Sequence, residues 1–393
     1  MKALAWHGKR DVRVDEVEDP KIEQPTDAII RVTSSGLCGS DLHLYEVMGP
    51  FLGEGDILGH EPMGIVEEVG SAVTNIKIGD RVVIPFNISC GSCFMCDHGL
   101  QSQCETTQNL EQGTGASLFG YTTLYGQVPG GQAEYLRVPQ AHYGPIKVPE
   151  GPPDDRFVFL SDVLPTAWQA VQYANVPQGG SLVVLGLGPI GEMCTRVAQH
   201  LGAGQVIGVD LVEDRLQRAA GHGVHTFDLA QTDDLTGQIR ELTGGRGPDS
   251  VIDAVGMEAH GSPGGKLAHA LAGLIPDPLA KKVMETAGID RLAAISSAID
   301  IVRRGGTISL SGVYGGAADP INMMQAFDKQ VNLRMGQANV KRWVDDILPL
   351  LTDEDPLGVD SYASHHRPLA EAPEAYADFQ GKLNGTFKVV FNP

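Results

Sequence analysis

The 393-residue sequence has no long hydrophobic run. Its most apolar stretch, SLVVLGLGPIG at 181–191, is too short and too rich in glycine to cross a bilayer. The first twenty residues contain no apolar segment of the kind found in a secretory leader. From these absences we predict no membrane partner and a cytoplasmic protein.

Basic residues are also scarce relative to acidic ones. The chain has 29 lysines and arginines against 49 aspartates and glutamates, which gives a formal net charge of -20. Nucleic acids and anionic membrane surfaces would repel such a protein, so neither is expected as a partner. The excess of acidic residues is better explained by its contribution to solubility. There is no internal repeat and no low-complexity tract, and the composition is that of an ordinary globular protein.

The chain is too long for one comfortable hydrophobic core, so two domains are expected. Up to about residue 149, short β-branched runs alternate with Gly, Pro and Asp, which indicates a mainly β domain. From residue 181, apolar strands alternate with amphipathic helices, which indicates a doubly wound parallel sheet. The class is therefore α/β. We assign 1–163 and 337–393 to the first domain and 164–336 to the second, which carries an extra segment at 257–290.

Four of the six cysteines are bunched as Cys90-x2-Cys93-x2-Cys96-x7-Cys104, and a lobe near 88–106 contains them. In a reducing compartment this spacing favours a metal over disulfides. Four thiolates suit a tetrahedral zinc and leave no open position, so this zinc would be structural and could contribute roughly 10–16 kcal/mol to folding. An iron–sulfur cluster, a redox role and inert thiols remain alternatives, and His98 is a possible substitute ligand.

A glycine-rich turn follows an apolar strand and opens a helix. Gly186, Gly188 and Gly191 fit the G-x-G-x-x-G pattern, and Asp210 ends the next strand about twenty residues later. This context indicates a dinucleotide site, with the pyrophosphate at the helix N-terminus. Asp210 would accept hydrogen bonds from the ribose hydroxyls and repel a 2′-phosphate, which favours NAD over NADP. The alternative is a turn without a ligand.

Two further stretches, GLCGSDLHLYE at 36–46 and ILGHEPMG at 57–64, complete an ordered set of motifs. With the four cysteines and the glycine-rich turn, they make the chain resemble the zinc-dependent medium-chain alcohol dehydrogenases over essentially its whole length. Within that family the closest resemblance is to the glutathione-independent formaldehyde dehydrogenases. Two features carry it: Asp162, where most of the family's alcohol dehydrogenases have a cysteine ligand, and the extra segment. The resemblance implies a GroES-like catalytic domain and a Rossmann domain.

The same resemblance implies a second zinc, which would be catalytic and would bring the total to two per chain. Its protein ligands would be Cys38, His60 and Asp162, with water or substrate in the fourth position. Asp41 would orient His60, and Glu61 would lie beneath the metal and assist ligand exchange.

The activity implied by the resemblance is hydride transfer from a small, formaldehyde-like aldehyde hydrate or an alcohol to NAD. Ser40 would accept the proton and pass it through the cofactor ribose to His43. Phe86 would form a wall of the substrate pocket. The further side chains and backbone implied to contact NAD are Gly39, Ser40, His43, Ile190, Arg215, Val255 and Lys388. Where related dehydrogenases often carry an arginine, this chain has Gly39, so one phosphate contact is missing.

Alternatives to this activity stay open. The substrate could be a larger alcohol or polyol, because pocket size cannot be read from the sequence. By the same resemblance, the extra segment would cover bound NAD and slow its release, which would allow an aldehyde dismutase with tightly bound NAD. From another class, the chain could be a zinc- and nucleotide-binding protein without turnover. A homo-oligomer, dimer or tetramer, is expected because the stretch QVNLRMG at 330–336 would form an exposed sheet edge.

Overall fold

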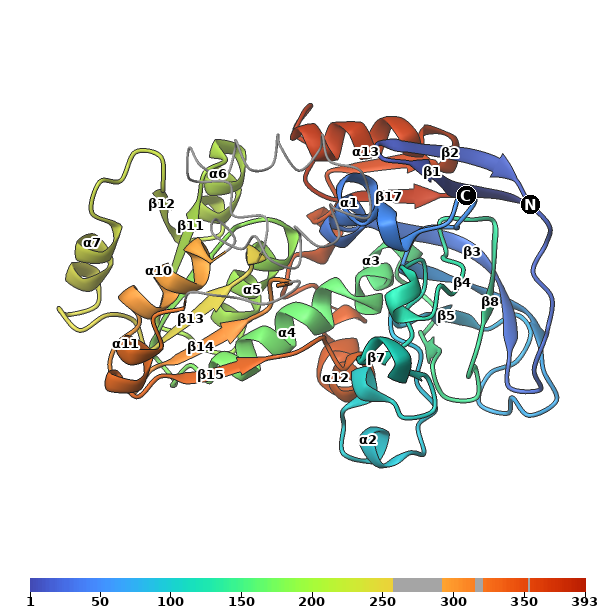
Figure 1. Ribbon diagram of the computed structural model, residues 1–393, viewed down its shortest axis with the longest axis horizontal. Coiled ribbons are helices and arrows are strands. Elements are labelled where there is room, and N and C mark those ends of the chain that lie inside the picture. The colour runs from blue at the N-terminus through green and yellow to red at the C-terminus, as the bar shows by residue number, and fades with distance from the viewer. Residues whose placement is uncertain (257–291, 315–320, 353) are drawn as a thin grey trace. The chain divides into compact units, whose positions relative to one another are not determined.

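A computed structural model describes residues 1–256, 292–314, 321–352 and 354–393. The chain divides into two compact units (Figure 1). The first unit comprises Met1–Pro165 and Ala338–Pro393, and the second comprises Thr166–Gln337. The extra segment expected at 257–290 lies outside the described residues. Within the described ranges, none of the helices has the length and apolar character required to span a bilayer.

The first unit is built on a mainly antiparallel sheet. Among the described residues this sheet has seven strands, in the order β16-β17-β3-β4-β5-β9, with β8 also paired to β3. Their bounds are β3 (Ala28–Leu37), β4 (Glu61–Val69), β5 (Arg81–Val83), β8 (Tyr135–Val138), β9 (Ile146–Lys147), β16 (His365–Pro368) and β17 (Val389–Asn392). The C-terminal strand β17 runs antiparallel to β3, with Val389 opposite Leu37. The C-terminal segment therefore completes the sheet of the N-terminal part, as the sequence suggested for the tail.

The first unit also contains a hairpin and several short helices. They are the hairpin β1 (Lys2–Gly8) and β2 (Asp11–Glu16), and the helices α1 (Gly39–Glu46), α3 (Asp154–Phe157), α12 (Val340–Ile347) and α13 (Ala372–Gly381), with single 3-10 turns that include η5 (Val158–Ser161). One core cluster joins β1, α1, α13 and β17 through buried side chains such as Leu44, Tyr45, Tyr376 and Phe391. Because α1 starts directly after Cys38, this cluster gives the start of the helix a rigid base.

The four-cysteine lobe has little regular structure. It contains α2 (Phe94–Asp97), the 3-10 turns η2 (Gln101–Gln103) and η3 (Leu110–Gln112), and the short antiparallel pair β6 (Gln108–Asn109) and β7 (Thr114–Ala116); η4 (Thr123–Tyr125) follows. Its buried cluster consists of Cys90, Cys96, Cys104 and Ala116, with Cys93 partly buried beside them. So small an apolar core cannot hold the lobe by itself, since a single buried side chain contributes only about 1.5–3 kcal/mol.

The second unit is a parallel sheet in the order β12-β11-β10-β13-β14-β15. The strands are β10 (Ser181–Leu185), β11 (Gln205–Asp210), β12 (His225–Asp228), β13 (Ser250–Asp253), β14 (Thr307–Leu310) and β15 (Asn332–Met335). The helices are α4 (Val163–Ala174), which begins in the first unit, α5 (Pro189–His200), α6 (Glu213–Gly221), α7 (Leu235–Leu242), α10 (Ala293–Ile301) and α11 (Met323–Asp328). The strand order reverses between β10 and β13, which is where doubly wound sheets bind dinucleotides. The predicted α/β class is confirmed.

Candidate active site

Four side chains that could bind a metal ion lie close together in the first unit. A thiol, an imidazole and two carboxylates, from Cys38, His60, Glu61 and Asp162, all offer ligand atoms within 4.8 Å of one another, and all four residues are buried. Cys38 follows β3, His60 and Glu61 stand at the start of β4, and Asp162 follows η5. Residues 124 positions apart in the chain thus meet because β3, β4 and the segment before α4 pack together.

The distances within this cluster suit a metal. His60 Nε2 lies 3.3 Å from Asp162 Oδ2, and the Cys38 thiol donates to the same oxygen at 3.7 Å. On the other side of the imidazole ring, His60 Nδ1 lies 3.1 Å from Asp41 Oδ1. An imidazole that turns one nitrogen to a carboxylate and the other to a thiol and a second carboxylate has the arrangement typical of a zinc ligand.

The electrostatics also favour a cation at this position. Burial, helped by Glu61 and Asp162, raises the pKa of Cys38 to about 11. Although burial opposes its charged form, the carboxylates of Asp41 and Asp162 raise the pKa of His60 well above its usual value. Without a metal the cluster therefore needs protons on sulfur and nitrogen. Zn²⁺ would replace those protons and balance the negative charges, so the donor set fits the ion.

Glu61 and Lys388 form a completely buried ion pair beside this cluster. Lys388 Nζ donates to both Glu61 oxygens, at 2.6 and 2.7 Å, and to the Leu37 carbonyl at 3.0 Å. Burial disfavours the charged lysine, but the Glu61 carboxylate outweighs it and raises the pKa of Lys388. The structure thus places Lys388 differently from the sequence-based expectation of a pyrophosphate contact: its ammonium is inaccessible, and its donors already have partners inside the first unit.

Gly39, Ser40 and His43 lie on α1, directly after Cys38. Ser40 and His43 are three residues apart on this helix, a spacing that places two side chains on one face. Both are half-buried. A Cβ added to Gly39 would have no neighbouring atom within 4 Å among the described residues. The start of the helix therefore carries a hydroxyl, an imidazole and uncovered backbone next to the buried cluster that contains Cys38.

Aromatic side chains flank the cluster. The rings of Phe86 and His60 are edge to face, with centroids 6.4 Å apart. Phe86 is fixed by backbone bonds to Ser161 and Phe119, so it lies next to the segment that carries Asp162. Tyr121 is a further aromatic residue here: burial raises its pKa, which also responds to the charges of His60, Asp41 and Cys38. No local motif marks it; it follows a glycine in an irregular loop.

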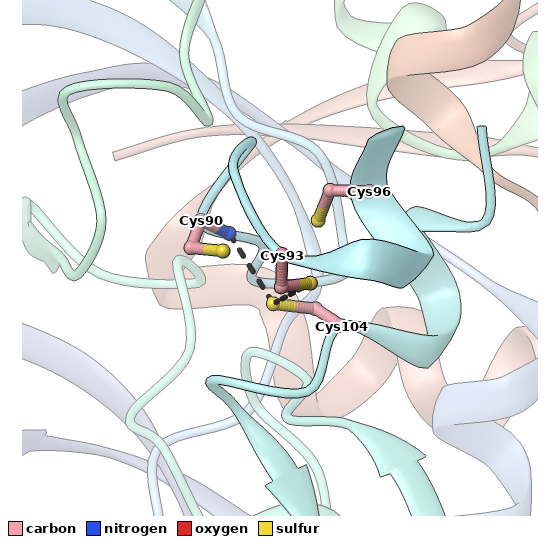
Figure 2. Close-up of side chains that lie close together, drawn as sticks. All are labelled: Cys90, Cys93, Cys96 and Cys104. Atoms are coloured by element: carbon pink, nitrogen blue, oxygen red, sulfur yellow. Dashed lines mark hydrogen bonds between the residues drawn. The ribbon is translucent and has the colours of Figure 1, made fainter. Parts of the chain in front are cut away.

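The four lobe cysteines turn their sulfurs toward one another (Figure 2). Their sulfur atoms lie within 4.8 Å of one another and all four thiols are free. Backbone N–H groups point at the sulfurs, from Cys90 to Cys104 at 3.3 Å and from Glu105 to Cys93 at 3.4 Å. Burial opposes ionisation of Cys90, but hydrogen bonds from Thr106 and Ser92 lower its pKa to about 6. These features fit a closed tetrahedral zinc site.

His98 does not join this group. Its Nδ1 lies 2.7 Å from the carbonyl of Phe94, and its ring stacks on the Phe94 ring with centroids 4.1 Å apart. The side chain is exposed to solvent.

The glycine-rich turn of the second unit connects β10 to α5. Gly186 has a φ of +84°, and a Cβ on Gly191 would come within 1.8 Å of the Gly186 carbonyl, so both positions require glycine. A Cβ on Gly188 would meet only the end of the Arg215 side chain, at 3.5 Å. Packing within the unit therefore does not explain why position 188 is a glycine. A ligand that approaches the backbone at this position would explain it.

Asp210 lies at the carboxyl end of β11, next to this turn. Its Oδ2 accepts the backbone N–H of Leu187 at 2.6 Å, and its Oδ1 accepts those of Leu211 and Val212. Arg215 Nη1 lies 3.7 Å from Oδ2. These hydrogen bonds anchor the Asp210 carboxylate to the glycine-rich turn.

Two other residues expected at the cofactor lie near the same turn. Ile190 is in the first turn of α5, and Val255 follows β13, where its side chain would touch a Cβ on Gly186.

Comparisons with known proteins agree with this arrangement. A family model for the alcohol dehydrogenase GroES-like domain matches residues 24–150, and one for zinc-binding dehydrogenases matches residues 189–262. An uncharacterized zinc-type alcohol dehydrogenase-like protein of Bacillus subtilis is 41% identical over 398 residues, which cover 100% of both chains. The formaldehyde dismutase of Pseudomonas putida is 33% identical over 402 residues, covering 96% of this chain and 94% of that protein.

A solved structure is similar along its whole length. The alcohol dehydrogenase of Thermus sp. ATN1 superposes with a TM-score of 0.81 at 33% identity, covering 100% of this chain and 99% of that one. With two family models, full-length relatives and this neighbour in agreement, the chain belongs to the zinc-type alcohol dehydrogenase family of oxidoreductases.

Proposed function

We propose that the protein is a zinc- and NAD-dependent dehydrogenase that oxidises a small alcohol or a hydrated aldehyde. The observation that carries this proposal is the buried donor set of Cys38, His60 and Asp162. One thiolate, one carboxylate and one neutral imidazole together balance the charge of Zn²⁺. The carboxylate is a harder and weaker donor than the thiolate that is usual at this position of the family. The metal would therefore be a stronger Lewis acid than in a site with cysteine at this position.

Zinc bound to these residues would polarise the substrate oxygen and lower the pKa of its hydroxyl. The chain's own groups would then handle the proton and the surroundings. Ser40, directly after the ligand Cys38 and its neighbour Gly39, would accept the hydroxyl proton, and His43, one turn further along α1, would pass it on. Phe86 would border the substrate with an apolar ring. Asp41 would keep the proton on Nδ1 of His60, so that Nε2 stays free for the metal.

NAD would accept the hydride. The glycine-rich turn and the N-terminus of α5 would bind its pyrophosphate, and Asp210 would bind the adenine ribose while repelling a 2′-phosphate. The proposal therefore includes a preference for NAD: the ratio of kcat/KM for NAD to that for NADP should be well above one, and a ratio near or below one would contradict the role of Asp210.

A second candidate is an aldehyde dismutase, which the similarity to a formaldehyde dismutase favours. In that reaction one hydrated aldehyde loses a hydride to bound NAD and becomes an acid. A second aldehyde takes the hydride and becomes an alcohol, so no net oxidant is consumed. This reaction requires that NAD stay bound between the two half-reactions.

One experiment separates these candidates. The purified protein is analysed for zinc and for nucleotide released on denaturation, and is then supplied with formaldehyde, ethanol or a polyol, with and without added NAD. A dehydrogenase produces NADH in proportion to substrate only when NAD is added. A dismutase yields equal amounts of acid and alcohol from aldehyde without added NAD. Zinc-loaded protein that does neither with any of these substrates would refute the proposal.

A further inference from the structure

A chain of buried polar side chains leads from α13 to His60. The Tyr376 hydroxyl donates to Gln132 Oε1 at 2.7 Å. Gln132 Nε2 donates to Asp41 Oδ2 at 3.3 Å, and Asp41 Oδ1 lies 3.1 Å from His60 Nδ1. Tyr376, Gln132 and Asp41 each have no exposed surface. Polar side chains this deep are costly unless each has a partner, so the order in which they contact one another is informative.

The orientation of the Gln132 amide follows from its neighbours. Nε2 faces two acceptors, the Asp41 carboxylate and the Gly36 carbonyl, each at 3.3 Å. Oε1 faces the Tyr376 hydroxyl, which can donate. A reversed amide would bring its oxygen against a carbonyl and a carboxylate, which repel it. Tyr376 and Gly36 together therefore keep the amide N–H groups pointed at Asp41.

The Asp41 carboxylate is held in turn. Oδ2 accepts both the Gln132 amide and the backbone N–H of Cys38, the latter at 3.0 Å. Two donors on one oxygen prevent rotation of the carboxylate and keep Oδ1 turned to His60. The imidazole is then oriented with Nε2 toward Cys38 and Asp162.

The backbone of the Gln132 segment reinforces this arrangement. Gly131 donates to the Gly59 carbonyl at 2.7 Å, and Gln132 donates to the Leu58 carbonyl at 3.0 Å. A Cβ on Gly59 would lie 2.4 Å from Gln132 Cγ. Gln132 thus packs against the residue that precedes His60, and its side chain and main chain both act on the same ligand.

We infer that Gln132 and Tyr376 are positioning residues of the catalytic metal site, which act through Asp41 to hold His60 in the orientation that binds zinc. This inference rests on the proposed function, because it assumes that Cys38, His60 and Asp162 bind the metal. Neither residue touches the ligand atoms themselves, and their effect should appear first in metal affinity.

The test measures zinc affinity without any substrate. Zinc at the catalytic site is titrated by competition with a chelator in the full-length protein, with the four-cysteine zinc as an internal reference. Tyr376→Phe deletes one hydroxyl, and Gln132→Met removes the amide at nearly constant volume. Tyr45→Phe is the matched control, because Tyr45 is buried in the same core cluster with its ring centroid 5.5 Å from that of Tyr376, and its hydroxyl has no part in this chain of contacts.

Mutation of a residue that supports a metal-bound side chain typically lowers metal affinity by about 10–100-fold. We expect Tyr376→Phe to weaken zinc binding about 10-fold and Gln132→Met at least as much, with the lobe zinc retained and Tyr45→Phe within about twofold of the wild type. Because the two residues act in series, the double variant should be no weaker than Gln132→Met alone. Cobalt substituted at the site should show a shifted visible absorption band in both variants and not in the control.

The results of these measurements distinguish a failure of the positioning role from a failure of the proposed function. Equal zinc affinity in Tyr376→Phe and Tyr45→Phe, in a wild type that oxidises alcohol, overturns the positioning role and leaves the function standing. If the wild type binds both zincs but shows no turnover, the function fails and the affinity comparison still decides the positioning role. A wild type that binds zinc only at the cysteine lobe overturns both. If Gln132→Met does not fold, Tyr376→Phe against its control decides.

Discussion

Replacing Lys388 with methionine tests how much the buried ion pair with Glu61 contributes to the stability of the fold. Both side chains have no exposed surface, and Lys388 Nζ contacts both Glu61 oxygens and the Leu37 carbonyl. Methionine fills a similar volume without the charge, and so leaves a buried carboxylate without its cation. Removing one partner of a buried pair costs about 3–5 kcal/mol.

The magnitude translates into a measurable shift in melting temperature. A domain of 150–250 residues loses about 2–4 °C for each kcal/mol, so Lys388→Met should lower Tm by roughly 6–20 °C. The assay is thermal unfolding of zinc-saturated protein by calorimetry and circular dichroism. Lys9→Met is the control, because Lys9 pairs with Glu46 at 3.3 Å but is half exposed. Exposed pairs contribute about 0–1 kcal/mol, so this variant should stay within a few degrees of the wild type.

A double variant gives the decisive comparison. Glu61→Gln together with Lys388→Met removes both charges, and most of the lost stability should return, because replacing a buried pair as a whole is often close to neutral. The reasoning is refuted if Lys388→Met melts within about 2 °C of Lys9→Met. It is also refuted if the double variant is as unstable as the single one, since the unpaired carboxylate would then not be the cause.

Three further predictions concern pH and the glycine-rich turn. The hydrogen bond to Asp15 raises the pKa of His7. The contribution of this ion pair to stability is therefore fully present below the unfolded pKa of about 6.5 and is lost as pH rises through the higher folded pKa. The Tm difference between wild type and His7→Gln should shrink as pH rises above about 6.5, and a Tm difference that does not change with pH would exclude the ion pair. Gly191→Ala places a methyl group 1.8 Å from the Gly186 carbonyl and should lower Tm sharply or prevent folding, which calorimetry would reveal. Gly188→Ala has room and should leave Tm within about 2 °C while it raises the Kd for NAD measured by fluorescence; unchanged NAD binding would argue against a ligand at Gly188.

Features encoded by local spacing could be predicted from the sequence. The four lobe cysteines and the glycines of the turn lie within short stretches, so the covalent chain itself brings them together. In the structure the four sulfur atoms lie within 4.8 Å of one another, and Gly186 has a positive φ. The α/β class followed from the alternation of apolar strands and helices, and the observed strand order agrees with it. The family prediction, which rested on the order of all these motifs, is confirmed by the comparisons.

Features that depend on long-range packing could not be predicted from local patterns. Cys38 and Asp162 meet across 124 residues, and only the family resemblance connected them. The family resemblance placed Lys388 at a phosphate, whereas the structure buries it against Glu61, directly before the strand β17 that pairs with β3. Gln132 and Tyr376 had no signal at all: they lie 244 residues apart, and no pattern in either segment marks them as partners.

The most direct test of the account is a count of zinc in two single variants. Asp162→Asn keeps the shape of the side chain but removes the anionic ligand, whereas Cys104→Ser removes one of the four lobe thiolates. The wild type should hold two zincs per chain. Asp162→Asn should retain one zinc and its Tm while turnover falls by more than about 100-fold, the upper range for mere partners of metal ligands. Cys104→Ser should lose the other zinc and be destabilised. Two zincs and undiminished turnover in Asp162→Asn would contradict the central claim that Asp162 binds the catalytic metal.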